Sequence, residues 1–126
     1  MVVVAFPVSR EVAFDYLVDP HNRAAWQSSL ARVEDVDGEP RVGQTWVDVT
    51  RPGLRPRMET TELDRPRRWA ERGTWRGITA TLTLDFVATD SGCDVMADFR
   101  INRLLRPLAL RAVRSDLRHA AATLTA

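Results

Sequence analysis

The fold is decided by residues 104–126, LLRPLALRAVRSDLRHAAATLTA, the one stretch long and regular enough to form a helix around which a small domain could be built. At about 1.5 Å per residue this helix would span roughly 35 Å, about the diameter of a small domain. Apolar residues recur in it at intervals of three and four, which predicts one face packed against a sheet. That face consists of Ala109, Leu110, Val113, Leu117, Ala120, Ala121 and Leu124.

The first turns of the predicted helix are apolar on two sides. Leu104, Leu108 and Ala112 lie opposite the packing face, where a surface helix normally carries charge. Pro107 fits an opening turn but disfavours helical geometry at Arg106, so we expect a connecting turn or a bend there. We interpret Leu104 and Leu108 as a portal that meets apolar cargo or membranes, and Leu108 and Ala112 as candidate ligand contacts.

The chain before this helix predicts an antiparallel sheet. A first strand, Val2–Phe6, precedes two short helices, whose starts are marked by Ser9 and by Asp19-Pro20. From Leu30 onward, turn sequences separate six strand-length segments, which is typical of a meander of hairpins. The turn sequences are Asp37-Gly38-Glu39-Pro40, Arg51-Pro52-Gly53-Leu54, Asp64-Arg65-Pro66, Arg76-Gly77 and Asp90-Ser91-Gly92.

Alternation of apolar and polar residues gives the strands one buried and one solvated face. The strands around Trp46 and Met58 alternate less cleanly, so the sequence does not decide which of their faces points inward. One helix fills a strongly curved sheet poorly, which favours a residual pocket, although the same inward side chains could simply fill the core. The residues expected to line the pocket are Trp69, Trp75, Leu82, Leu84, Phe86, Val95 and Phe99.

Glu71 shares the inward side of its strand with two tryptophans and is the best polar candidate. A carboxylate among aromatic side chains needs a partner or a raised pKa. Glu71 is therefore either an anchor or general base for a ligand, or one half of an ion pair with Arg72 or Arg76 at the rim. Asp48 and Tyr16 are weaker candidates.

No catalytic constellation is visible. The two histidines, His21 and His119, are expected at the surface, and together with the lone Cys93 they make neither a zinc site nor a nucleophile with its base. No phosphate-binding glycine loop occurs. The sequence thus assigns no catalytic residue, no metal and no cofactor.

The composition predicts one domain, residues 1–126. A single cysteine excludes an internal disulfide, and the apolar start of the chain is too short for a signal peptide, so we expect a cytoplasmic monomer or homodimer without a membrane span. Residues 100–118 hold six arginines against one aspartate. All eighteen basic residues are arginine, however, which weakens the case that this patch was selected to bind nucleic acid.

The order of elements predicts an α+β helix-grip fold, in which a curved seven-stranded antiparallel sheet closes around one long helix. Several motifs resemble the START-like, Bet v 1-like (SRPBCC) superfamily, and more narrowly its small bacterial polyketide cyclase/dehydrase and lipid-transport group. This resemblance implies a cavity between sheet and helix that many members use for lipids, sterols, polyketides or other apolar molecules. The motifs are Asp19-Pro20-His21-Asn22-Arg23 with Trp26, Val42-Gly43, residues 61–68 (TELDRPRR) and the Leu-Leu-Arg-Pro start of the last helix.

Three functions are compatible with the sequence. Binding or transport of a hydrophobic small molecule comes first, because no catalytic constellation is visible. The alternative is a polyketide cyclase or aromatase that acts largely by folding its substrate inside the cavity. The third is a surface-interaction protein whose arginine-rich helix contacts nucleic acid or anionic lipid.

Overall fold

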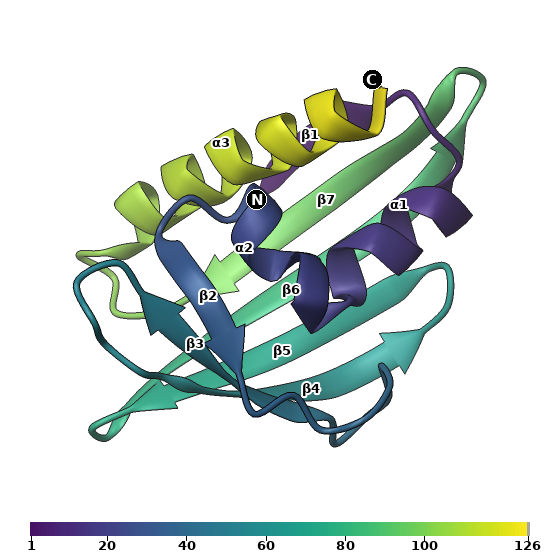
Figure 1. Cartoon of the computed structure of the whole chain (residues 1–126). Helices are drawn as coiled ribbons and strands as arrows, with labels where there is room; N and C mark the ends of the chain where they lie inside the picture. The colour runs from purple at the N-terminus through teal and green to yellow at the C-terminus, as the bar shows by residue number, and fades with distance from the viewer. Residues whose placement is uncertain (126) are drawn as a thin grey trace.

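The chain folds into a curved sheet that wraps around a long C-terminal helix (Figure 1). The structure, a computed structural model, describes residues 1–125. It confirms the predicted order of elements and adds a short 3-10 helix between the two small helices. In chain order the elements are β1 (Val2–Phe6), α1 (Arg10–Val18), η1 (Pro20–Asn22), α2 (Arg23–Trp26), β2 (Leu30–Glu34), β3 (Thr45–Thr50), β4 (Arg57–Asp64), β5 (Arg68–Trp75), β6 (Ile78–Thr89), β7 (Gly92–Arg100) and α3 (Arg106–Thr125).

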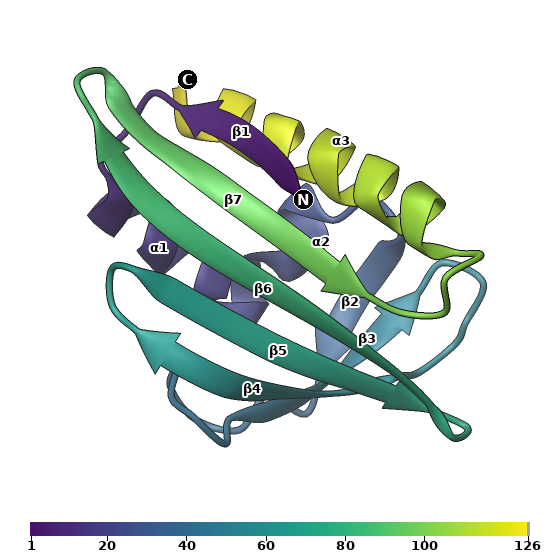
Figure 2. The ribbon, with the colours of Figure 1, turned by 180° about the vertical axis from the view of Figure 1, so that it is seen from behind.

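The sheet has the strand order β1-β7-β6-β5-β4-β3-β2 and is antiparallel throughout. Strands β2 to β7 form the predicted meander, and β1 lies beside β7, with Val4 opposite Val95. Seen from behind, the strands lie in front of the helices (Figure 2), so the helices occupy the concave face. The predicted seven-stranded helix-grip architecture is confirmed.

The β5–β6 hairpin ends in the two-residue turn Arg76-Gly77. Both residues have positive φ, 47° and 79°, as in the mirror-image turns whose twist matches that of antiparallel strands. Trp75 and Ile78 pair across the turn, and the guanidinium of Arg76 lies 5.1 Å from the centroid of the Trp75 ring. The hairpin therefore presents an aromatic and an aliphatic side chain together at this end of the sheet.

Helix α3 begins at Arg106, directly after a turn over residues 103–105. The side-chain oxygen of Asn102 accepts a hydrogen bond from the backbone N–H of Leu104 at 3.0 Å, so the expected connecting turn is confirmed. None of the helices within residues 1–125 is long and apolar enough to cross a membrane.

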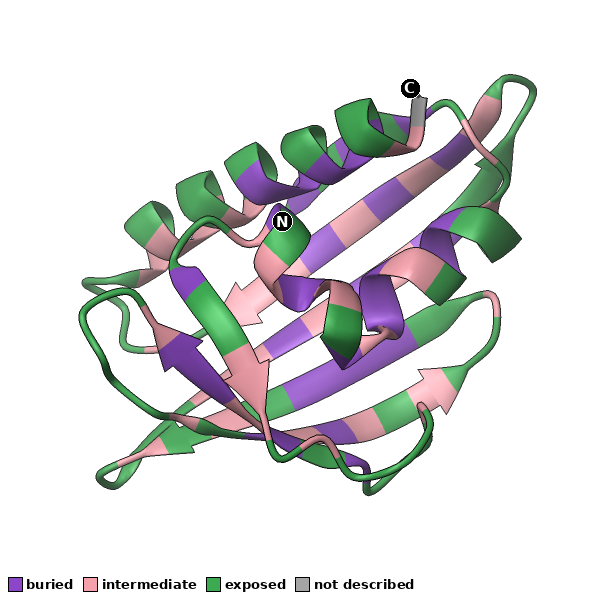
Figure 3. Cartoon of the chain, in the orientation of Figure 1, coloured by how far each residue is buried: buried purple, intermediate pink, exposed green. Residues whose placement is uncertain are grey.

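The apolar face of α3 packs tightly only in its second half. Leu117, Ala120 and Ala121 are buried against the sheet, whereas Ala109 and Val113 are only half-buried. Figure 3 shows this gradient along the helix, from exposed and intermediate residues at its start to buried residues farther on. The first half of α3 therefore leaves unfilled space above the sheet.

Buried apolar residues lie beneath α1, toward the other end of β6 and β7. Helix α1 starts at the cap Ser9, whose hydroxyl accepts a hydrogen bond from Val12 N at 3.2 Å. Its Phe14 meets Phe86 of β6 edge to face, with ring centroids 5.1 Å apart, a favourable geometry for aromatic pairs. This cluster fixes α1 and leaves the opposite end of the sheet for the cavity.

Candidate functional site

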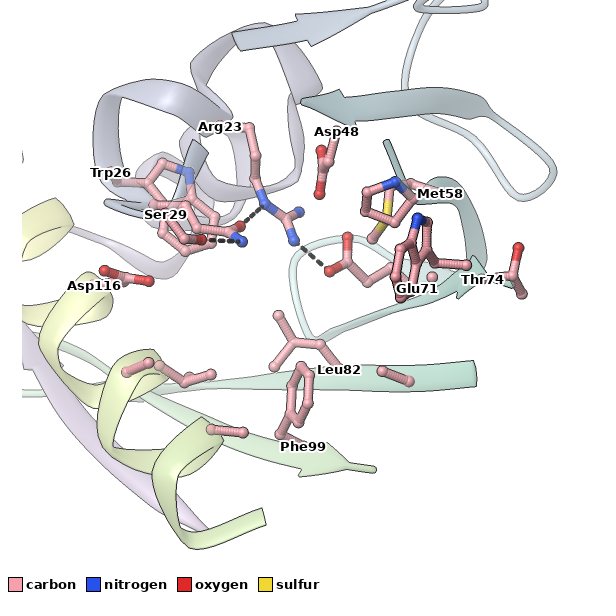
Figure 4. Close-up of a pocket in the computed structure, with 18 of the residues that line it drawn as sticks. Arg23, Trp26, Ser29, Asp48, Met58, Glu71, Thr74, Leu82, Phe99 and Asp116 are labelled. Carbon is pink, nitrogen blue, oxygen red and sulfur yellow. Dashed lines mark hydrogen bonds and ion pairs between the residues drawn. The ribbon is translucent and has the colours of Figure 1, made fainter. Parts of the chain in front are cut away.

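A cavity of about 330 Å³ lies between the sheet and the first half of α3. One end of it is apolar, and in Figure 4 Leu82 and Phe99 of the sheet face the charged pair Arg23 and Glu71 across the space. The apolar wall is formed by the β5–β6 hairpin, the inner face of β6 and β7, and α3. The residues concerned are Trp75, Ile78, Ala80, Leu82, Phe99, Ala109, Ala112 and Val113.

Five of the ten predicted ligand contacts lie at this cavity, namely Glu71, Trp75, Leu82, Phe99 and Ala112. The other five lie elsewhere. Trp69, Leu84, Phe86 and Val95 are buried in the core, and Leu108 is 63% exposed on α3. Strand alternation identifies the inward face of a strand but not the position along it that a helix covers. Helix α1 covers the other end of β6 and β7, so the inward residues there belong to the core and not to the cavity.

The polar end of the cavity is built around a buried ion pair between Arg23 of α2 and Glu71 of β5. Nη2 of Arg23 donates to Oε2 of Glu71, and Nε donates to Oε1 of Gln27. The guanidinium also lies near two indole rings, 5.1 Å from the centroid of Trp26 and 5.7 Å from that of Trp69. Both charged side chains are almost fully buried, at 3% and 4% exposure, so their mutual attraction is weakly screened.

Two further carboxyl groups face the same space from other elements. Asp48 of β3 is buried and accepts a hydrogen bond from Nε1 of Trp46 at 2.9 Å. Trp46 and Asp48 are both buried, so the side of β3 that carries them faces inward. The sequence did not decide between the two sides of this strand. Asp116 of α3 accepts hydrogen bonds from the hydroxyl of Ser28 at 3.0 Å and from its backbone N–H at 3.3 Å. The guanidinium of Arg23 is therefore paired with Glu71 and is also attracted electrostatically by Asp48 and Asp116.

Burial shifts the ionisation of these groups. Desolvation raises the pKa of Glu71, and the nearby positive charge of Arg23 opposes the rise without cancelling it. Burial likewise raises the pKa values of Asp48 and Asp116. For Arg23, desolvation disfavours the charge, but attraction by the carboxylates outweighs it, so the pKa of the guanidinium stands above its usual range.

One oxygen of this cluster lacks a protein partner. Oε1 of Glu71 is buried and makes no hydrogen bond to any described residue, while Oε2 is held by Arg23. A buried polar atom without a partner carries a substantial free-energy cost, unless a ligand or water satisfies it. The arrangement can therefore receive a hydrogen-bond donor, or accept a proton, at the end of an apolar space.

The sequence did not identify Arg23 as the partner of Glu71. The two expected partners lie elsewhere: Arg72 donates to Glu59 at 2.9 Å, and Arg76 stacks on Trp75. The available signal was the spacing in α2, where Arg23 precedes Trp26 by three residues and so shares the inward face of a helix that follows an Asp-Pro start. Tyr16, the other weak candidate, is half-buried and does not line the cavity.

The surface next to the cavity combines apolar and basic side chains. Leu104 and Leu108 are 85% and 63% exposed, and Ile78 of the hairpin is exposed as well. Farther along α3, Arg111, Arg114 and Arg118 are exposed, and no ion pair involves them in the part of the chain that the structure describes. The predicted portal leucines thus lie on the surface near a basic helix face.

Comparison with known proteins gives one family. The family described as polyketide cyclase/dehydrase and lipid transport matches residues 2–126. No curated protein matches the chain in sequence.

Several solved structures share the fold at low sequence identity. Protein MLL2253 from Mesorhizobium loti is 14% identical, with a TM-score of 0.79 over 98% of this chain and 94% of that one. Ara h 8.0201 is 10% identical, with a TM-score of 0.78 over 98% and 95% of the two chains. DynU16, from the dynemicin biosynthetic locus, is 12% identical, with a TM-score of 0.79 over 98% of this chain and 46% of that one. At these identities the likeness establishes the fold alone.

Proposed function

Because the chain belongs to the polyketide cyclase/dehydrase and lipid transport family, we propose that it binds and carries a hydrophobic small molecule in the cavity between the sheet and α3. The observation that carries the proposal is a space of about 330 Å³ with apolar walls and a buried polar cluster at one end. Binding sites for small molecules typically have this composition: mostly apolar lining with a few placed polar groups.

The walls favour an elongated or ring-shaped apolar ligand. Trp75, Leu82 and Phe99 lie on the sheet side, and Val113 of α3 lies at the helix side of the same space. Each buried methylene contributes about 0.8 kcal/mol, so the affinity for a series of alkyl compounds should rise with chain length until the cavity is full. The sequence shows no nucleophile with its general base, which favours a binding or transport function over catalysis.

Native mass spectrometry of freshly purified protein tests the proposal directly, together with binding of Nile red, an uncharged apolar dye. We expect a co-purifying small molecule or stoichiometric dye binding. Phe99→Arg should abolish dye binding, because it places a charge in the apolar wall, whereas Val87→Arg, on the outer face of β6, should not. Equal dye binding by both folded variants would refute a cavity lined by Phe99.

A cyclase or aromatase is the second candidate, and the unpartnered oxygen of Glu71 is the observation that favours it. A carboxylate with a raised pKa in an apolar space can act as a general base. Turnover of a linear aromatic polyketide, lost in Glu71→Gln, would favour this function. Dye binding without turnover would favour a carrier.

The exposed leucines at the start of α3 would serve the carrier as a membrane-facing portal. Replacing Leu104 and Leu108 by serine should slow ligand uptake from anionic vesicles, because the variant loses apolar contact with the acyl chains. The matched control replaces Val3 and Val42, which are also exposed. If both double variants take up ligand at the wild-type rate, the portal assignment is wrong.

A further inference from the structure

The charge at the polar end of the cavity is unbalanced. Arg23 supplies one positive charge for the three carboxyl groups of Glu71, Asp48 and Asp116, so full ionisation would leave two net negative charges, and the raised pKa values of these groups reflect the cost of ionising them in this site. These groups come from α2, β5, β3 and α3. A cavity of this kind resists a further negative charge, because like charges repel strongly where water is excluded.

Arg23 is also poorly placed to receive an anionic ligand. Its Nε is occupied by Gln27 and its Nη2 by Glu71. The remaining side of the guanidinium faces Asp48 (Figure 4). Its Cζ atom also lies over the indole rings of Trp26 and Trp69. The positive charge is therefore directed at protein groups rather than at the open space.

Glu71 offers the complementary feature. Glu71 is only 4% exposed and lines the cavity, and its Oε1 is buried without a hydrogen-bond donor among the described residues. A carboxylate oxygen accepts hydrogen bonds only, and a charged donor forms the strongest ones. The partner that Oε1 lacks is thus a donor, and the charge balance favours a positive one, whereas the buried indole N–H of Trp26 lacks an acceptor in the described part of the chain.

We propose that the natural ligand is an apolar amine, whose protonated nitrogen donates to Oε1 of Glu71 while its carbon skeleton lies against Trp75, Leu82 and Phe99. This inference rests on the proposed binding function and specifies the ligand class for the same cavity. A fatty acid would place a fourth carboxylate beside three others. A neutral alcohol can donate to Glu71 but brings no compensating charge, so it should bind with intermediate affinity.

Displacement of Nile red by decylamine, decanol and decanoate tests the ligand class, because the three probes share one alkyl chain and differ in the head group. At about neutral pH we expect decylamine to bind at least tenfold more tightly than decanoate, as is typical when a charge-assisted hydrogen bond is gained. Decanoate binding as tightly as decylamine, or more tightly, would overturn the proposal. This comparison needs only the wild-type protein.

Glu71→Gln tests whether the preference for decylamine over decanoate depends on Glu71. The guanidinium of Arg23 only donates hydrogen bonds, so the amide oxygen of the variant, its one acceptor, should stay with Arg23 and the amide nitrogen should replace Oε1 in the cavity. Decylamine then loses its acceptor while decanoate gains a donor, and the tenfold preference should disappear. A preference unchanged in the folded variant would exclude Glu71 as the site.

A second variant keeps the ion pair intact. Asp48→Asn combined with Asp116→Asn retains oxygen acceptors for Trp46 and Ser28 but removes two ionisable carboxyl groups, so the preference for decylamine over decanoate, measured as the ratio of the two affinities, should fall measurably. Asp90→Asn, in the distant β6–β7 turn, makes the control for loss of an acidic group, and its ratio should match wild type. An unchanged ratio in the double variant would refute the charge argument.

The two levels of the proposal fail differently. If Nile red binds and decanoate is preferred, the amine assignment falls while the cavity still binds apolar molecules. If neither the dye nor any of the three alkyl probes binds the folded protein, the proposed binding function falls as well.

Discussion

Removal of Arg23 tests the central claim that the polar end of the cavity is a buried ion pair. In Arg23→Met an aliphatic side chain is kept, whereas the charge and the hydrogen bonds to Glu71 and Gln27 are lost. Glu71 and Asp48 then remain buried without a cation. Breaking a buried pair from one side typically costs about 3 to 5 kcal/mol, and loss of each cation–π contact adds about 0.5 to 2 kcal/mol.

Protonation limits this loss. Without the attraction of Arg23, which lowers the pKa of Glu71, that pKa rises further, and protonation of the carboxyl group removes the charge but not the buried polar atom. We therefore expect Arg23→Met to lose about 3 kcal/mol. A chain of 126 residues is typically stable by about 6 to 19 kcal/mol, so the variant should still fold.

Urea unfolding of a double-mutant cycle provides the measurement. Arg23→Met combined with Glu71→Met replaces the pair by apolar side chains, and such replacements are often neutral or stabilising. The double variant should therefore be more stable than Arg23→Met alone, by about 2 kcal/mol or more. If the two single losses simply add, Arg23 and Glu71 do not interact, and the account of the site given above is wrong.

Three other predictions concern the sheet and the buried acids. Gly92→Ala should lower the free energy of unfolding by about 2 kcal/mol or more, because the added Cβ would collide with a backbone oxygen of β1. Gly77→Ala, with φ 79° and open space around the new Cβ, should lower it by only about 1 kcal/mol. Equal losses in urea unfolding would contradict the close approach of β1 to Gly92. Cys93 is buried and burial raises the pKa of its thiol, so a thiol reagent should modify the folded protein far more slowly than the urea-unfolded chain. Burial raises the pKa values of Asp48 and Asp116, so the folded state retains protons that the unfolded chain releases. Stability should therefore fall as pH rises from about 4 through the raised pKa values. Asp48→Asn with Asp116→Asn should flatten this fall, measured as the urea midpoint at a series of pH values.

Most of the fold could be predicted from local patterns in the sequence. Turn residues such as Arg76-Gly77 and Asp90-Ser91-Gly92 fix the hairpins, and alternation fixes the inward faces of β6 and β7, because both depend on neighbouring residues alone. The apolar face of α3 follows from helical spacing in the same way. These expectations are confirmed.

The site was harder to predict because it depends on pairs that are distant in sequence. Arg23 and Glu71 lie 48 residues apart and meet only after α2 folds over the sheet. The inward face of β3, which carries Asp48, could not be predicted because the apolar residues Val47 and Val49 point to the side opposite Trp46 and Asp48. The placement of Trp69 in the core likewise depends on α1 and α2, whose position over the sheet no local pattern specifies.

The uneven packing of α3 should make the two halves of the helix differ in local stability. Its second half is held by Leu117, Ala120 and Ala121, while Ala109 and Val113 in its first half border the cavity and are only half-buried. Backbone amides in the first turns should therefore exchange with solvent through local opening, and those near Leu117 only through much larger unfolding. A ligand in the cavity should slow amide exchange in the first half of α3 toward the rate of the second half, because it supplies the contacts that the first half lacks. Hydrogen exchange along this one helix would then report cavity occupancy without any label on the ligand.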